Sequence, residues 1–184
     1  MKKFSAIAFL FLLLTACNSG TETKSEATET PAVSSQTPTA ADAAVSAVLP
    51  PSSTDGLKSA IEGFASGDMS AFTANMDDNV KFYYPVPGDS LVGKQAVLDF
   101  YTKRRSLSDS IVVVNPVYLG IRNSTNAAAA QGDWLMAWYT FAIKYKNGKR
   151  IALPIHIVQH LNAAGKIDIM AMYYDFHRVM EASK

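Results

Sequence analysis

Between residues 54 and 106 the apolar positions follow a helical period. Apolar residues at Leu57, Ala60, Ile61 and Phe64 are spaced by three and four, which predicts an amphipathic helix that ends at Gly67. Asp68 can cap a second, shorter helix. A third helix is predicted from residue 93 to about 106, because its apolar residues share one face.

The remaining apolar runs are typical of strands. A strand is predicted at 80–84 and a short return strand at 90–92, joined by a Pro- and Gly-rich turn. Asn147-Gly148 is a strong hairpin signal, and connections as short as those between the later runs favour antiparallel neighbours. The pattern predicts an α+β domain in which a curved antiparallel sheet wraps around about three N-terminal helices like a cone. The four later runs cover 111–122, 127–145, 150–161 and 166–176.

The N-terminus carries its own pattern. Two lysines precede an apolar run at 4–14 that is too short to span a bilayer, which is typical of a signal peptide. The run ends in Leu-Thr-Ala-Cys, and Cys17 is the only cysteine of the chain. This ending resembles the bacterial lipobox, which implies a lipoprotein signal peptide at 1–16 and palmitate-type acylation of Cys17. The alternative is a free thiol beside a signal peptide.

The segment after Cys17 differs from the rest. Residues 17–53 are rich in Thr, Ser, Ala, Glu and Pro and contain no aromatic residue, so we expect a disordered tether. The domain at 54–184 would then reach the membrane through the lipid anchor only. In lipoprotein signals the residue after the cysteine influences the destination, and by this resemblance Asn18 implies the outer membrane. The expected location is therefore the cell envelope.

Composition and charge exclude several classes of function. The chain has 17 basic and 16 acidic residues and no basic stripe, so no nucleic-acid partner is expected. The sequence shows no phosphate-binding loop, dinucleotide glycine set, nucleophile elbow or metal-ligand cluster. We therefore expect no cofactor and no metal site.

Two segments resemble a known family. "FASGDMSAFTANMDDNVKFYYPVPGDSLVGKQAVLDFYTKRR" is similar to the opening of SnoaL-like domains in the nuclear transport factor 2-like superfamily, and "GKIDIMAMYYD" resembles their last strand. The similarity covers about residues 54–178. It implies the cone-shaped, nuclear transport factor 2-like (cystatin-like) fold. That superfamily hosts isomerases, cyclases, hydrolases, dehydratases and binding modules, so the fold does not decide the function.

The position of the expected catalytic base is informative. Related ketosteroid-isomerase-type enzymes place a carboxylate just before a proline at the end of the first strand, where this sequence has Tyr84. A phenol is a poor base at neutral pH and a good hydrogen-bond donor, so Tyr84 is expected to line a pocket. Asp89, the nearest carboxylate, lies in the following turn and is expected to be solvated or to form an Asx-turn.

The other ionisable candidates lie on predicted strands. His156 and His160 differ by four, so in a strand they lie on one face about 13 Å apart, too far to chelate one metal. Which face of this strand looks into the cone stays open. His156 is a candidate acid/base, with a hydrogen-bonded structural role as the alternative. Asp175 is a candidate catalytic residue, with the alternative of accepting backbone hydrogen bonds.

These observations leave three hypotheses. The first is a protein with no clear catalytic set that binds a small apolar molecule or an envelope protein. The second is an isomerase, lyase or hydrolase that uses His156 and Asp175 for acid/base catalysis. The third is a structural module that forms a homodimer through the outer face of the sheet. The residues expected to line the pocket are Tyr84, Tyr101, Trp138, His156 and Tyr173.

Overall fold

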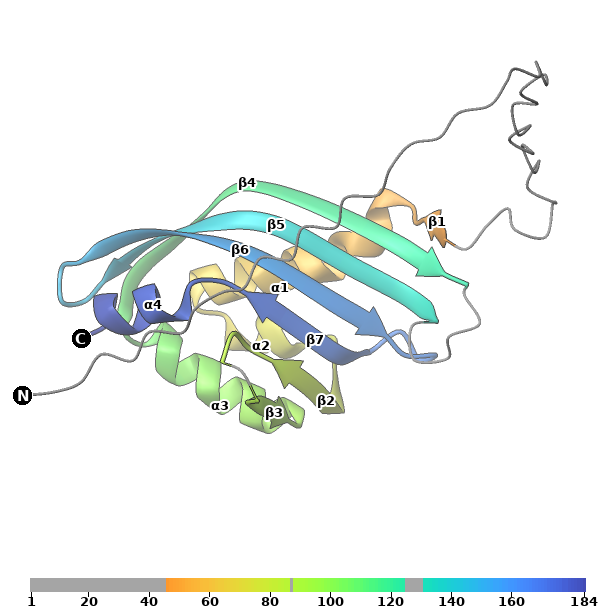
Figure 1. The fold of residues 1–184 in the computed structure, drawn as a ribbon, viewed down its shortest axis with the longest axis horizontal. Coiled ribbons are helices and arrows are strands. Elements are labelled where there is room, and N and C mark those ends of the chain that lie inside the picture. Colours follow the sequence, from red (N-terminus) through yellow and green to blue (C-terminus); the bar gives the residue numbers. More distant parts are fainter. Residues whose placement is uncertain (1–45, 87, 125–130) are drawn as a thin grey trace, which may run out of the picture. The chain divides into compact units, whose positions relative to one another are not determined.

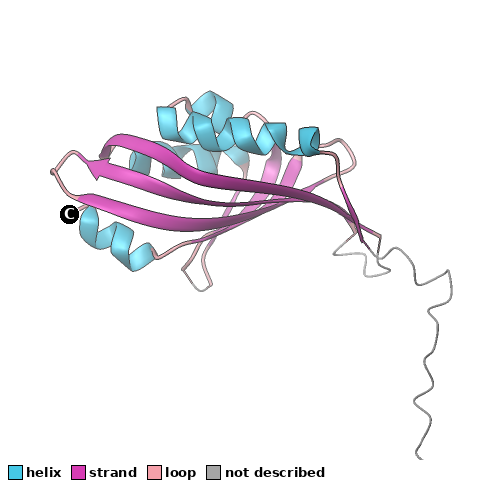
Figure 2. Ribbon diagram, turned by 90° about the horizontal axis from the view of Figure 1, so that it is seen from above, coloured by secondary structure: helices cyan, strands magenta, loops and turns pink. Residues whose placement is uncertain are grey.

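A curved sheet of seven strands carries helices against one of its faces (Figure 1; Figure 2). The computed structural model describes residues 46–86, 88–124 and 131–184. The predicted signal peptide, Cys17 and most of the predicted tether lie outside these residues. The architecture confirms the predicted α+β class. No helix among the described residues is long and apolar enough to cross a membrane.

The first three α-helices confirm the predicted helical segments. Gly67 ends α1 in the left-handed conformation, and the Asp68 carboxylate accepts hydrogen bonds from the first backbone N–H groups of α2. The fourth helix was not predicted, because the last strand was expected to run on to residue 176. The helices are η1 (Pro51–Thr54), α1 (Asp55–Ser66), α2 (Met69–Thr73), α3 (Lys94–Arg105) and α4 (Phe176–Ala182).

Most strands also lie where they were predicted, and one pairing differs from the expectation. β4 to β7 are antiparallel neighbours joined in sequence order, but β2 runs parallel to β7, so the sheet is mixed. A parallel pair needs a long connection, and α3 with β4 to β6 provides it. The strands are β1 (Ser46–Val48), β2 (Met76–Tyr83), β3 (Ser90–Val92), β4 (Ser108–Asn123), β5 (Gly132–Tyr145), β6 (Arg150–Leu161) and β7 (Ile167–Tyr173), in the spatial order β1-β4-β5-β6-β7-β2-β3.

Regular structure is present before the expected domain boundary at residue 54. β1 pairs with the end of β4, and the Leu49 backbone N–H donates to the Gly120 carbonyl at 2.8 Å. An unpaired sheet edge exposes backbone groups, and β1 covers the end of this edge. The prediction of a disordered tether therefore does not apply to residues 46–53.

Cross-strand register separates the two faces of the sheet. On β5, the side chains of Tyr139 and Phe141 belong to the buried core, whereas Trp138 is exposed on the opposite face. On β6, Leu153 and Ile155 lie opposite Phe141 and Tyr139, so they share this buried, inner face of the sheet. The alternate residues of β6 therefore point outward. The inner face is the one that the helices cover.

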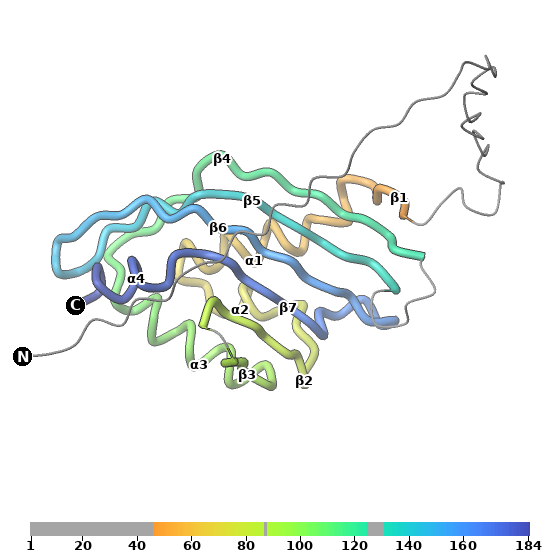
Figure 3. Tube along the Cα trace, in the orientation of Figure 1, coloured from red at the N-terminus to blue at the C-terminus, as the bar shows by residue number. Residues whose placement is uncertain are grey.

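Helix α4 lies at the end of the sheet where β5 turns into β6 (Figure 3). The Asn147 side-chain amide donates to the Ala182 carbonyl at 2.8 Å, and the Lys149 ammonium donates to the Glu181 carbonyl at 2.9 Å. These two contacts join the hairpin tip to the last turn of α4. The helix therefore closes one end of the space between the sheet and α3.

Candidate functional site

A half-enclosed cavity of about 50 Å³ lies between α3, α4 and the inner face of β4 to β6. We refer to it as the inner cavity. Its walls are mainly apolar and aromatic, and they include Phe64, Ile111, Phe141, Leu153 and Met172. A cavity of about 150 Å³ holds benzene, so the inner cavity accepts a smaller group unless a wall moves.

Three phenols, those of Tyr101, Tyr145 and Tyr174, add polar groups to these walls. Tyr101 is 4% exposed, and its hydroxyl donates to the Met172 sulfur at 3.8 Å. Burial, followed by the neighbouring Tyr174, holds the pKa of Tyr101 well above its ordinary value. Tyr101 is therefore a neutral group that can donate a hydrogen bond at physiological pH.

The charged group of the inner cavity is Arg104. Its guanidinium carbon lies 4.5 Å from the centre of the Phe100 ring and 4.7 Å from the centre of the Phe176 ring. Its Nη2 contacts the Met180 sulfur at 3.7 Å, and its buried Nε has no hydrogen-bond partner among the described residues. The sequence hides this residue, because Lys-Arg-Arg at the end of α3 is typical of a solvated helix C-terminus.

A second cavity, of about 20 Å³, shares Phe64, Tyr101, Phe141 and Met172 with the first. Gln159 lines it and is 1% exposed, and its Oε1 has no partner within the described chain. A cavity of this size has room for about one water molecule, which such an oxygen would bind. Sequence reasoning missed Gln159, although its spacing from the inward-facing Ile155 could have placed it on the same face.

The five predicted pocket residues separate into three groups. Tyr101 lines the inner cavity, as its place on α3 suggested. Tyr84 lies beside the cavity without lining it: its ring centre is 5.2 Å from that of Phe100, and its hydroxyl donates to Asp89 at 3.2 Å. Burial, followed by the Asp89 charge, raises the pKa of Tyr84. Asp89 is therefore the partner of a phenol in an exposed turn.

The other three predicted pocket residues lie together on the outer face. The Trp138 and His156 rings stack with centres 4.7 Å apart, and the His156 and Tyr173 rings stack at 5.7 Å. We call Trp138, His156 and Tyr173 the aromatic stack. They do not line the inner cavity, because the alternate residues of β5 and β6, such as Phe141 and Ile155, are the ones that face the helices. These three residues are neighbours, as the prediction implied, but they lie on the face of the sheet opposite to the cavity.

The two candidate catalytic residues have different surroundings. His156 belongs to the aromatic stack, and its Nε2 is buried without a partner in the described part of the chain. Asp175 is the N-cap of α4, where its carboxylate accepts from the Arg178 backbone N–H at 2.9 Å. This contact is the structural alternative that the sequence left open. Within the described ranges no contact joins Asp175 to His156.

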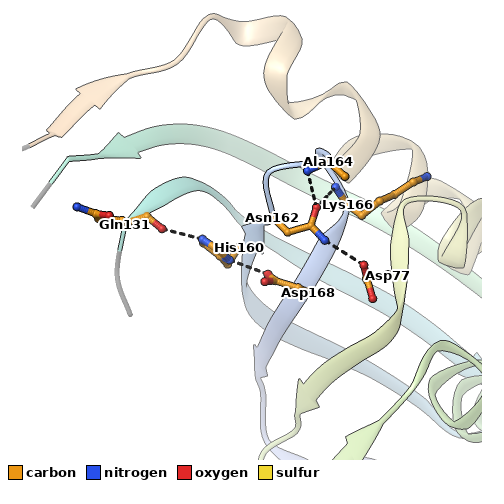
Figure 4. Close-up of polar contacts among 7 residues, drawn as sticks. All are labelled: Asp77, Gln131, His160, Asn162, Ala164, Lys166 and Asp168. Carbon is orange, nitrogen blue, oxygen red and sulfur yellow. Dashed lines mark hydrogen bonds and ion pairs between the residues drawn. The ribbon is translucent and has the colours of Figure 1, made fainter. Parts of the chain in front are cut away.

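His160, on the same face of β6 as His156, joins three strands (Figure 4). Its Nδ1 lies 2.6 Å from the Asp168 carboxylate on β7, and its Nε2 lies 2.8 Å from the Gln131 carbonyl just before β5. Both contacts are hydrogen bonds only when both ring nitrogens carry protons. The described chain brings no third metal-ligating side chain to this pair. The geometry therefore supports a structural role for His160.

Comparisons with known proteins agree with this architecture. A family model described as SnoaL-like domain matches residues 57–169. A candidate polyketide cyclase from Pseudomonas putida has 22% identity and a TM-score of 0.56, and the match covers 71% of this chain and 96% of that one. A candidate isomerase from Bacillus subtilis has 17% identity and a TM-score of 0.57, covering 71% and 91%.

A third structure is a hypothetical protein with a ketosteroid isomerase-like fold from Catenulispora acidiphila, in complex with trimethylamine. It has 11% identity and a TM-score of 0.53, and the match covers 70% of this chain and 92% of that one. No curated protein matches the chain. At these identities the structural likeness shows the fold alone, and the function must be argued from the site.

Proposed function

We propose that this chain, which belongs to the SnoaL-like domain family, binds a small and mostly apolar molecule in its inner cavity. The observation that carries the proposal is a half-enclosed aromatic cavity with a few polar groups at fixed positions. Apolar walls with a small number of placed donors are typical of small-molecule sites. The trimethylamine complex of the Catenulispora protein is an example of a small molecule bound by this fold.

The alternative, an isomerase, lyase or hydrolase, has less support. General acid/base catalysis needs an ionisable group within reach of the substrate. No Asp, Glu or His lines the inner cavity in the part of the chain that the structure describes. His156 and Asp175 are placed on the outer face and at the α4 cap, so the geometry favours binding over acid/base chemistry.

Blocking the cavity tests the proposal. Ile111 lines the inner cavity, and its neighbour Val112 is exposed on the opposite face. The full chain, purified from its own host, is examined by native mass spectrometry as wild type, Ile111→Phe and Val112→Phe. We expect a small-molecule adduct on wild type and on Val112→Phe that is absent from Ile111→Phe. A bare wild-type mass, or the same adduct on all three proteins, would contradict the proposal.

A second candidate role is pairing with another copy of the chain through the outer face. This face is uncharged in its middle, where the aromatic stack lies beside Val117, which is 58% exposed. Two identical uncharged patches can meet about a twofold axis without like-charge repulsion. In sedimentation velocity we expect a dimer for wild type and for Gln95→Lys on α3, and a monomer for Trp138→Lys. A monomeric wild type at micromolar concentration would exclude this role.

We also propose that the domain works at the cell envelope, most simply at the outer membrane, anchored through Cys17. The support is the basic start, the short apolar run and the single cysteine at the cleavage position. In labelled palmitate, wild type should incorporate the label and sediment with membranes, whereas Cys17→Ala should do neither. Equal labelling of both proteins would contradict the anchor.

A further inference from the structure

Two neighbouring arginines at the end of α3 have contrasting surroundings. Arg105 donates to three backbone carbonyls, two from α1 and one from the start of β4, each at 3.1 Å. Arg104 donates to no oxygen of the described residues. Arg105 therefore joins α3 to its neighbours, and the hydrogen-bonding capacity of Arg104 is left largely unused.

The unused part of Arg104 is the edge that binds carboxylates. Arg122 shows this edge in use, because its Nε and Nη2 donate to the two oxygens of Asp133 at 2.7 and 2.8 Å. On Arg104 the same edge has a buried Nε without a partner and an Nη2 that meets only the Met180 sulfur, a weak acceptor. A buried donor without an acceptor is unfavourable, so this edge favours an acceptor from outside the chain.

Arg104 is also held in place. The rings of Phe100, one turn earlier on α3, and Phe176, on α4, lie on the guanidinium at 4.5 and 4.7 Å. Cation–π contacts of this kind fix the side chain without using its N–H groups. A ligand would therefore meet a guanidinium that is already held at the wall of the inner cavity.

The charge of Arg104 is not neutralised by a neighbour. No carboxylate among the described residues forms an ion pair with it, and none lines the inner cavity. Burial raises the pKa of Tyr145 and Tyr174, and the positive charge of Arg104 opposes this rise in both. The charge therefore acts on the walls of the cavity, where a low dielectric strengthens it.

We infer that the ligand of the inner cavity is a small apolar carboxylic acid, whose carboxylate accepts from the Nε and Nη2 of Arg104 while its apolar part contacts the aromatic walls. This inference rests on the proposed function, because it needs a ligand in that cavity. The volume of about 50 Å³ admits the end of such a molecule, and the rest would extend through the open side of this half-enclosed cavity. A planar guanidinium matches a carboxylate at two points, which a neutral amide cannot reproduce.

The test compares acids with their neutral amides on the full chain by calorimetry. The probes are phenylacetate with phenylacetamide and octanoate with octanamide. Wild type should bind each acid roughly tenfold or more tightly than its amide. Arg104→Met should lose this preference, and Arg104→Lys, which keeps the charge without the two-point edge, should keep only part of it. Lys103→Met removes the same charge from the exposed neighbouring residue and should leave the preference unchanged.

The outcomes separate the two proposals. Amides that bind wild type as tightly as the acids, or an equal loss of preference in Lys103→Met and Arg104→Met, would overturn the carboxylate inference and leave the binding cavity standing. A wild type that binds neither acids nor amides, and that shows no adduct from its own host, would overturn both.

Discussion

The inner and outer faces of this sheet carry similar residues and have different surroundings. Phe141 on the inner face is 3% exposed, and Trp138 on the outer face of the same strand is 41% exposed. Both faces are apolar and aromatic, so the chemistry of the strands does not separate them. The helices do, because α1 and α3 cover one face and no described element covers the other. In this sheet, the packing of the helices decides which apolar residues become core and which remain available for contacts.

The sharpest test of this difference is one large truncation on each face. Phe141→Ala should lower the free energy of unfolding by about 3–5 kcal/mol, because it leaves a hole in a packed core. Trp138→Ala should cost about 1 kcal/mol, mostly from lost stacking on His156. Urea unfolding followed by far-UV circular dichroism measures both. Equal costs would show that a partner buries the outer face as completely as the helices bury the inner one.

The sequence predicted the features that depend on local signals and missed those that depend on packing. Local signals sufficed for the elements: the caps at Gly67 and Asp68, the Asn147-Gly148 turn and the period of α1 all lie where they were predicted. Helix α4 was missed because the last strand was expected to include Phe176, and the apolar residues that follow it, Val179, Met180 and Ala182, are too few to show a helical period. Short elements at a chain end are defined by packing rather than by pattern.

The candidate site was harder to predict, for a physical reason. Leu153 and Ile155 point to one face of β6 and His156 points to the other, and both faces are apolar. The alternation therefore separates the residues into two groups without indicating which group faces the helices. Arg104 was missed because its role depends on Phe176, which is 72 positions further along the chain. Contacts of this kind have no local signature.

Two histidines on the outer face provide a finer comparison, because they share a strand and a face. His160 joins β5, β6 and β7 through two contacts, whereas the Nε2 of His156 has no partner among the described residues. His160→Ala should lower the free energy of unfolding by about 2 kcal/mol. His156→Ala should cost less than about 1 kcal/mol, since it loses ring stacking only.

Thermal unfolding at neutral pH measures this pair of histidine variants. The partner variant Asp168→Asn serves as a control, because it should weaken one of the two contacts of His160 and cost less than His160→Ala. A larger loss for His156→Ala than for His160→Ala would contradict the structural role of His160. It would also point to a partner for the Nε2 of His156 outside the described residues.

The smallest expected effect lies at the end of the sheet beyond the helices, where Arg122 on β4 pairs with Asp133 on β5. The hydrogen bond from Arg122 holds the pKa of the Asp133 carboxyl below its ordinary value. A lowered pKa in the folded state means that the stabilisation is present above the unfolded pKa and is lost as the pH falls through the folded one. Because the pair is partly exposed, Asp133→Asn should cost roughly 0.2–1 kcal/mol at pH 7. Urea unfolding of both proteins from pH 7 to pH 2 should show that their difference in free energy of unfolding falls to zero below the folded pKa. A difference that stays constant would mean that the carboxylate charge does not stabilise this end of the sheet.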